Sequence, residues 1–147
     1  AAVLKRQLRA IIAGAAAGSL CGMASSALFV WAAGGSKQLI ATVIPKSVTS
    51  PISIEIVNLL GGFPELGAVL TVLTGLIGSI IGPPFLKMIR VRGDVAAGAA
   101  IGTSSHGIGT ARMIRESELQ GSAAGFAMGL AGILTSIMAV PLYWILG

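Results

Sequence analysis

Charged side chains are scarce in this sequence. Only 10% of its 147 residues are Asp, Glu, Lys or Arg, whereas 54% are hydrophobic, and the mean hydropathy is +0.91. Soluble domains carry about 25% charged residues, so this composition excludes an ordinary soluble domain. The single cysteine, Cys21, excludes a disulfide framework and a cysteine metal cluster. We therefore expect no metal site and no cofactor.

Motifs of common enzyme classes are also missing. The sequence contains no paired-carboxylate site, HExxH, P-loop or GxSxG pattern. Ser105 and His106 are adjacent, but a triad needs its base beside the nucleophile in space, oriented by a third group. We expect no enzymatic activity. The net charge of +5 fits the positive-inside bias of membrane proteins. Nucleic-acid binding would need a solvated basic face, and the sequence does not contain one.

Long apolar runs are what the sequence does contain. Residues 8–33, 66–86 and 121–147 each reach the ~20 apolar residues that a membrane span needs. The fold class that we predict is an all-α polytopic membrane protein, with transmembrane helices plus two broken or re-entrant helices. Its five membrane elements are residues 8–33, 38–60 (broken at 45–51), 66–89, 94–115 (broken around 104–107) and 121–146.

The placement of the basic residues tests the topology of these elements. If all five cross the membrane, the basic clusters at residues 5–9 and 87–92 lie on opposite sides, against the positive-inside bias. If the second element is a re-entrant hairpin, both clusters share a side, and a hairpin in the fourth element adds Arg112 and Arg115. We favour hairpins, with full crossings as the alternative. Two breaks flanking an intact element also suggest an inverted repeat.

The first break combines a lysine with a helix start. Ser50 before Pro51 reads as an N-cap followed by the first helical residue, and such helix ends bind anions. Lys46 adds a positive charge there, unless it snorkels to an interface. Glu55 either balances Lys46, carries a proton, or is a helix charge favoured by the dipole. The candidate binding residues are Lys46, Ser47, Thr49 and Ser50.

The second break holds the only histidine. Histidine can gain or lose a proton near neutral pH, so His106 is a candidate proton carrier; the alternative is a buried neutral side chain bonded to backbone. Arg112 either pairs with a carboxylate or lies at the interface. Hydroxyls for a polar solute and glycines for close approach complete the candidate set, which is Thr103, Ser104, Ser105, His106, Gly107, Gly109, Thr110 and Arg112.

Glycines recur at a spacing of four residues, which places small residues on one helix face and lets backbones approach closely. The sets are Gly14/Gly18/Gly22, Gly121/Gly125/Gly129, Gly78/Gly82 and Gly98/Gly102. Packing within the chain is the first interpretation, and packing between subunits of a homo-oligomer is the second.

Several stretches of the sequence resemble one family, the LrgB/CidB family. They are residues 45–52 (PKSVTSPI), 74–78 (TGLIG), 102–112 (GTSSHGIGTAR) and 121–128 (GSAAGFAM). The resemblance covers nearly the whole chain, and it implies that residues 1–147 are a single transmembrane domain, the C-terminal two-thirds of a family member. It also implies a multi-pass protein of the bacterial cytoplasmic (inner) membrane.

The resemblance implies two functions. The family was first described as holin/antiholin-like, acting on murein hydrolases, cell lysis and programmed cell death with a small LrgA/CidA-like membrane partner. Bacterial members are tied to pyruvate or acetate movement, and a plant relative is the plastidial glycolate/glycerate translocator. We therefore expect a transporter of small carboxylate anions, with His106 and Glu55 as the candidate groups for proton coupling. The alternatives are an oligomeric holin-like pore or lysis regulator, and a structural subunit for the partner.

Overall fold

The computed structural model describes residues 5–146, which form helices joined by short turns. The helices are α2 (Leu8–Ala32), α3 (Lys37–Val43), α4 (Ser50–Leu59), α5 (Pro64–Met88), α6 (Asp94–Glu116) and α7 (Glu118–Leu146). Within these described residues, three stretches are long and apolar enough to cross a membrane, namely Leu8–Ala32, Pro64–Met88 and Glu118–Ile145. The predicted all-α membrane fold is therefore confirmed.

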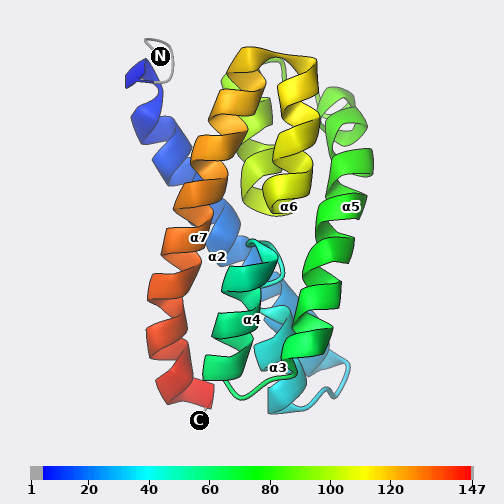
Figure 1. Ribbon diagram of the computed structural model, residues 1–147, viewed down its shortest axis with the longest axis vertical. Helices are drawn as coiled ribbons and strands as arrows, with labels where there is room; N and C mark the ends of the chain where they lie inside the picture. Colours follow the sequence, from blue (N-terminus) through cyan, green and yellow to red (C-terminus); the bar gives the residue numbers. More distant parts are fainter. Residues whose placement is uncertain (1–4, 147) are drawn as a thin grey trace.

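The first broken element is a helical hairpin formed by α3 and α4 (Figure 1). Ser36 caps the start of α3, because its Oγ accepts the N–H of Leu39 at 3.2 Å. The chain leaves helical pairing at Pro45, which has no N–H to donate, and α4 then runs back to the end from which α3 started. The N–H of Phe63, in the loop after α4, donates at 2.9 Å to Oγ1 of Thr42 in the last turn of α3, which ties the return loop to α3.

The start of α4 differs by one residue from our prediction. The N-cap is Thr49 rather than Ser50, and its side chain makes no capping hydrogen bond. Ser50 is the first helical residue and Pro51 the second. Proline is tolerated throughout the first turn, because the N–H groups there have no partner within the helix. A proline therefore locates the start of a helix in the sequence only to within a residue or two.

The second broken element, α6, is also a hairpin (Figure 1). His106 has the non-helical angles φ 41° and ψ −136° and separates two arms, residues 94–105 and 107–116. Gly109 on the return arm packs directly on Ile101 of the first arm. Both arms end on the same side, where Gln120 Nε2, just past the return arm, donates to Asp94 Oδ1 at 2.8 Å. Each arm is roughly 15–18 Å long at 1.5 Å per residue, about half a membrane thickness.

The two hairpins enter from opposite ends of the molecule, and this arrangement gathers the basic residues. The start of α2, the end of α5 and the end of α6 share one end (Figure 1), so eight of the ten Lys and Arg residues lie there. These are Lys5, Arg6, Arg9, Lys87, Arg90, Arg92, Arg112 and Arg115. Lys37 lies at the opposite end and Lys46 at a hairpin tip. The re-entrant alternative, rather than full crossings, is therefore what the structure has.

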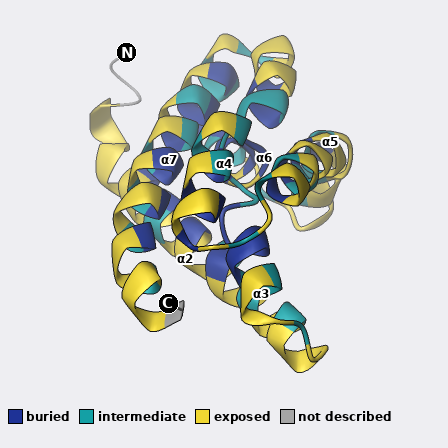
Figure 2. Ribbon diagram, turned by 60° about the horizontal axis from the view of Figure 1, so that its bottom comes forward, coloured by how far each residue is buried: buried dark blue, intermediate teal, exposed yellow. Residues whose placement is uncertain are grey.

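Two of the four glycine sets, Gly78/Gly82 and Gly98/Gly102, are contact surfaces within the chain, and of the set on α7 only Gly121 is closely packed. A Cβ on Gly78 would collide with Ser105, and one on Gly102 would collide with the backbone of Ala124 on α7. Gly121 lies directly against Ile114. The glycines therefore let α5 and α7 pack closely against the α6 hairpin, because no side chain separates the helices at these positions. Figure 2 shows the consequence, with buried residues concentrated between the helices and exposed residues on their outer faces.

The fourth glycine set, on α2, packs differently. An added Cβ on Gly14 would meet nothing within 4 Å, and the contacts of Gly18 and Gly22 are single side chains, Thr103 and Ser47. Both of these side chains belong to hairpin tips. The glycine face of α2 is therefore an open surface that leads to the tips.

Candidate functional site

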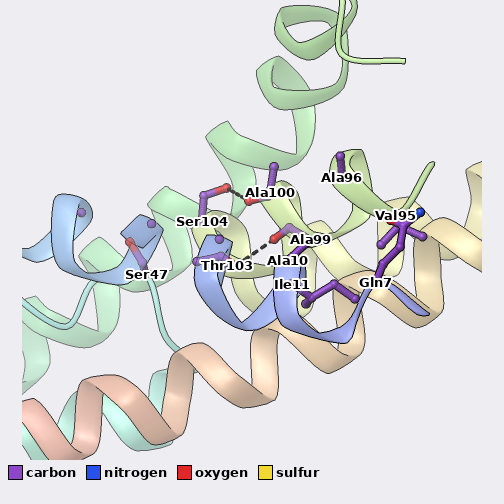
Figure 3. A pocket seen from close by; sticks show the side chains of 13 residues that line it. Gln7, Ala10, Ile11, Ser47, Val95, Ala96, Ala99, Ala100, Thr103 and Ser104 are labelled. Atoms are coloured by element: carbon purple, nitrogen blue, oxygen red, sulfur yellow. Dashed lines mark hydrogen bonds between the residues drawn. The ribbon is translucent and has the colours of Figure 1, made fainter. Parts of the chain in front are cut away.

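The tips of the two hairpins meet beside the middle of α2. Ser47 of the first tip and Thr103 of the second line the same groove, which has a volume of about 440 Å³ (Figure 3). The same two residues also line a small cavity of about 10 Å³, to which α2 and α7 contribute further lining residues. Candidate residues of both breaks, Ser47 and Thr103, therefore line the same spaces in the structure.

Lys46 is the only charged side chain at either tip. It is partly buried, and its Nζ donates to the main-chain oxygen of Gly22 at 3.2 Å. A lysine ammonium has three donors, so this single bond leaves capacity for an anion. Charged groups at this depth in a membrane are costly and mark functional paths. Lys46 does not snorkel to an end of the molecule, because its ammonium is held against the middle of α2.

Ser19 on α2 is a residue that sequence reasoning missed. It is only 5% exposed, and its Oγ has no hydrogen-bond partner within the described residues. It lines the small cavity together with Thr135 of α7 and the tip residues Ser47 and Thr103. A cavity of this size is near the lower limit for one water molecule or one ligand oxygen. An unsatisfied buried hydroxyl costs about 1–3 kcal/mol, so Ser19 Oγ is available to a polar group in this cavity.

Most hydroxyls of the second tip donate hydrogen bonds to main-chain oxygens of their own helix. Thr103 donates to the oxygen of Ala99, Ser104 to that of Ala100 and Thr110 to that of His106, each at 2.8 Å. Such bonds satisfy a hydroxyl in an apolar setting. These side chains can still accept hydrogen bonds but donate none to a solute. For an anion, the donors at the site are therefore Lys46 and, by rotation of their hydroxyls, Ser47 and Ser19.

His106 joins the two hairpins through α5. Its ring is 4% exposed, and Nε2 lies 2.8 Å from the main-chain oxygen of Thr71. Because that oxygen can only accept, Nε2 carries the proton and Nδ1 is the nitrogen that can gain one. The hydroxyl of Thr71 in turn donates to Ser53 Oγ of α4 at 2.9 Å. Thr71 and Ser53 were not among the predicted residues.

The backbone of His106 is strained. A φ of 41° at a non-glycine residue costs on the order of 1–3 kcal/mol, and such strain persists where the surroundings hold the residue in place and often marks function. The ring packs against Gly75 of α5, where any side chain would collide with it. The contact with Gly75, the bond to Thr71 and the hairpin turn together hold this conformation.

The other candidate residues lie farther from the shared cavity. The guanidinium of Arg112 pairs with Glu116 at 2.8 Å, and its side chain is 52% exposed at the basic end, which matches the interfacial alternative. Glu55 is exposed on the outer face of α4, and no ion pair joins it to Lys46 among residues 5–146. Gly109 closes the hairpin, whereas Gly107 has open space around it.

Four predicted residues, Lys46, Thr49, Ser50 and Ser105, lie at or beside the tips but line neither the groove nor the small cavity. Thr49 and Ser50 begin α4 directly after the first tip and are partly buried. Ser105 is fully buried, with its Oγ 3.2 Å from that of Ser104, and it faces Gly78 rather than the groove.

Comparison with known proteins decides the family. Residues 1–145 match the LrgB-like family. The chain belongs to this family. The LrgB-like chain is 35% identical over 135 residues to YxaC of Bacillus subtilis, covering 92% of this chain and 59% of YxaC. It is 37% identical over 140 residues to YwbG of the same organism, covering 95% and 61%.

A third relative carries a functional name. The LrgB-like chain is 33% identical over 105 residues to the holin-like protein CidB of Staphylococcus aureus, covering 71% of this chain and 46% of CidB. The chain spans about 60% of the length of YxaC and YwbG. No solved structure matches it.

Proposed function

We propose that this LrgB-like protein moves small monocarboxylates of the pyruvate, acetate and glycolate class across the bacterial cytoplasmic membrane, as a transporter rather than an enzyme. The observation that supports this most directly is Lys46, whose partly buried ammonium has one bond, to the oxygen of Gly22. A carboxylate is the small group that accepts charge-assisted hydrogen bonds from an ammonium and from hydroxyls.

The surroundings of Lys46 suit one carboxylate rather than two. Ser47 follows it in the chain, and the unsatisfied Ser19 lines the small cavity together with Ser47, so both are neutral donors near the first tip. No second Lys or Arg lies at either tip, because Arg112 pairs with Glu116 at the basic end. Two hairpins that meet from opposite ends are also the arrangement in which secondary transporters place their substrate near the bilayer midplane.

Proton coupling enters the proposal through His106. Protonation of Nδ1 would place a charge in a buried ring that holds α5 and, through Thr71, the first hairpin. The proposed coupling is that proton binding at this ring alters the bond to Thr71 and with it the arrangement of the tips. Glu55 is a less direct candidate, because it lies exposed on α4.

A second candidate function is a holin-like pore or a lysis regulator that acts by oligomerising. The name of the CidB relative favours it, and so does the open glycine face of α2. An LrgA/CidA-like partner and a homo-oligomer belong to both proposals. Uptake by a carrier saturates with substrate concentration and depends on the residues of the hairpin tips. Passage through a pore does not saturate and depends on the open helix faces that pack between subunits. Gly125→Leu should therefore cost a pore more activity than Ser105→Ala, because Gly125 has only Thr110 nearby.

The deciding experiment is uptake of radiolabelled pyruvate into proteoliposomes containing the protein, with and without an LrgA-like partner. We expect saturable uptake that acetate inhibits. Lys46→Gln should reduce uptake by roughly tenfold or more, since a hydrogen bond to a charged group contributes about 1.5–3 kcal/mol. The matched control is Lys37→Gln, an exposed lysine at the start of α3, which should change little. Unsaturable leak of unrelated solutes would instead support the pore.

A further inference from the structure

The basic end of the molecule carries the whole net charge of the protein. Eight of the ten Lys and Arg residues lie there, but only three of the five Asp and Glu residues do, namely Asp94, Glu116 and Glu118. The remaining two basic and two acidic residues cancel. A positive end is what the positive-inside bias alone produces, so a binding site at this end needs local geometry as well.

A pocket of about 180 Å³ supplies that geometry where the two arms of the α6 hairpin end. Its lining comes from the last residues of α5, the loop that joins α5 to α6, both arms of α6, and Gln120 of α7. All of these segments meet at the basic end (Figure 1). Lys87 at the end of α5 and Arg92 in the loop are its basic lining residues, and Asp94 and Glu116 are its acidic ones.

The acidic side chains of this pocket have partners, whereas the basic ones do not. Glu116 accepts a hydrogen bond from Arg112 at 2.8 Å, and Asp94 accepts one from Gln120 at 2.8 Å. The side chains of Lys87 and Arg92 make no hydrogen bond and no ion pair with any of residues 5–146. An ammonium and a guanidinium that line one pocket without partners are complementary to the oxygens of a phosphate group.

The rest of the pocket wall is apolar, which favours a lipid over a soluble phosphate. Its apolar lining residues are Pro83, Leu86, Val91, Ala97 and Met113. Beside the pocket, Phe85 and Met88 of α5 are large apolar side chains that are 49% and 70% exposed, so this end of α5 is in contact with lipid. A phospholipid carries a phosphodiester next to its glycerol and acyl chains, and it therefore supplies both the polar and the apolar contacts.

We propose that this pocket binds the phosphate group of an anionic phospholipid of the cytoplasmic leaflet, such as phosphatidylglycerol, and that Lys87 and Arg92 bind its oxygens. Basic pockets between transmembrane helices on the cytoplasmic side recognise anionic headgroups in this way. The bound lipid lies between α5 and the α6 hairpin, so it connects the two elements and stabilises the folded protein by mass action. The proposal does not depend on carboxylate transport.

The test is thermal unfolding of the purified protein in detergent, titrated with phosphatidylglycerol, phosphatidylcholine or glycerol phosphate. We expect phosphatidylglycerol to raise the unfolding temperature by a saturating amount, and the other two to raise it much less at the same concentrations. Lys87→Gln/Arg92→Gln should raise the phosphatidylglycerol concentration at half of the full shift roughly tenfold, because two partly exposed ion pairs are lost.

The matched control is Lys5→Gln/Arg115→Gln. It removes one Lys and one Arg from the same end of the molecule, but neither residue lines any of the described pockets. The half-shift concentration of this variant should stay close to that of the wild type. Lys87 and Arg92 are exposed and unpaired, so their variants should fold, and the unfolding temperature without lipid checks this.

A further variant tests the pocket without changing its charges. Ala97 is partly buried in the pocket wall, so Ala97→Leu places a larger side chain in the space that the lipid would occupy. We expect Ala97→Leu to lose most of the shift with phosphatidylglycerol while Lys87 and Arg92 remain in place.

Each alternative gives a different result and would overturn the proposal. An equal loss of response in the two double variants would show that diffuse positive charge attracts the lipid, without a site. An equal shift with glycerol phosphate would show that the pocket takes a soluble phosphate. A full response in Ala97→Leu, or an equal shift with phosphatidylcholine, would show that the anionic headgroup does not bind in this pocket.

Discussion

His106 is the residue on which the most constraints converge. Its backbone is strained, its ring is buried against Gly75, and its Nε2 holds the oxygen of Thr71. Because Thr71 also donates to Ser53 of the first hairpin, hydrogen bonds through Thr71 connect this ring to both hairpins. A titratable group in that position connects proton binding to the geometry of the tips.

The proton role predicts a separation of transport from its driving force. His106→Gln keeps an amide donor for Thr71 but cannot titrate, whereas His106→Ala would also leave a cavity in the packing. We expect His106→Gln to retain pyruvate uptake down a concentration gradient and to lose the stimulation by an inward proton gradient. The measurement is initial uptake rate with and without that gradient. Equal stimulation of wild type and variant would refute the role.

The close packing of the ring on α5 predicts a cost at Gly75. A Cβ at this position would lie 2.5 Å from His106 Cε1 and Nε2, so Gly75→Ala forces the ring away from Thr71. Overpacking of this kind costs typically 1–3 kcal/mol. We expect a lower unfolding temperature for Gly75→Ala in detergent. Gly129→Ala, in open space, should match wild type or exceed it, since alanine favours helix over glycine.

Sequence alone identified the residues that are chemically isolated. Lys46 and His106 stand out because few charged or titratable groups occur in the apolar stretches, and both lie where the breaks predict. Ser19 and Thr71 could not be found in this way, since a hydroxyl in an apolar helix ordinarily bonds to its own backbone. Only packing shows that Ser19 lacks that bond and that Thr71 bridges two elements.

At the scale of elements, the hairpins depend on glycines that the sequence shows but does not explain. Both breaks were predictable from proline, glycine and hydroxyl content, although the start of α4 shifted by one residue. Glycines at the same spacing have different surroundings in the structure. Gly98 and Gly102 admit the backbone of α7, while Gly14 faces open space. A spacing of four residues predicts that small residues share one helix face, but it does not predict which element packs on that face.

These contacts predict opposite outcomes for two glycines in α6. Gly102→Ala places a methyl group onto the main chain of Ala124, which cannot move aside as a side chain can. Gly107→Ala places one in open space at the tip. We expect Gly102→Ala to prevent the protein from folding into a monodisperse form, or to lower its unfolding temperature markedly. We expect Gly107→Ala to fold and to keep the wild-type unfolding temperature. Size-exclusion chromatography and thermal unfolding measure both, and equal tolerance would contradict the packing of α6 on α7.

At the scale of the whole molecule, two hairpins entering from opposite ends leave three full crossings, α2, α5 and α7. Charge bias favoured this topology, but it could not exclude five crossings, because the bias is a tendency. The tertiary contacts decide it. Asp94 and Gln120 meet at one end, and Thr42 meets Phe63 toward the other. Neither contact can be read from the sequence, since both depend on how each hairpin folds back.

The topology predicts which ends share a side of the membrane. In a Cys21→Ala background, single cysteines at Ser36 and Glu65 should react with a membrane-impermeant maleimide in intact cells. Cysteines at Arg92 and Arg115 should react only after permeabilisation, because the end with eight basic residues faces the cytoplasm by the positive-inside bias. If α3–α4 and α6 crossed fully, Ser36 and Glu65 would lie on opposite sides, as would Arg92 and Arg115. Labelling within each pair therefore tests each hairpin separately, whichever way the protein is oriented.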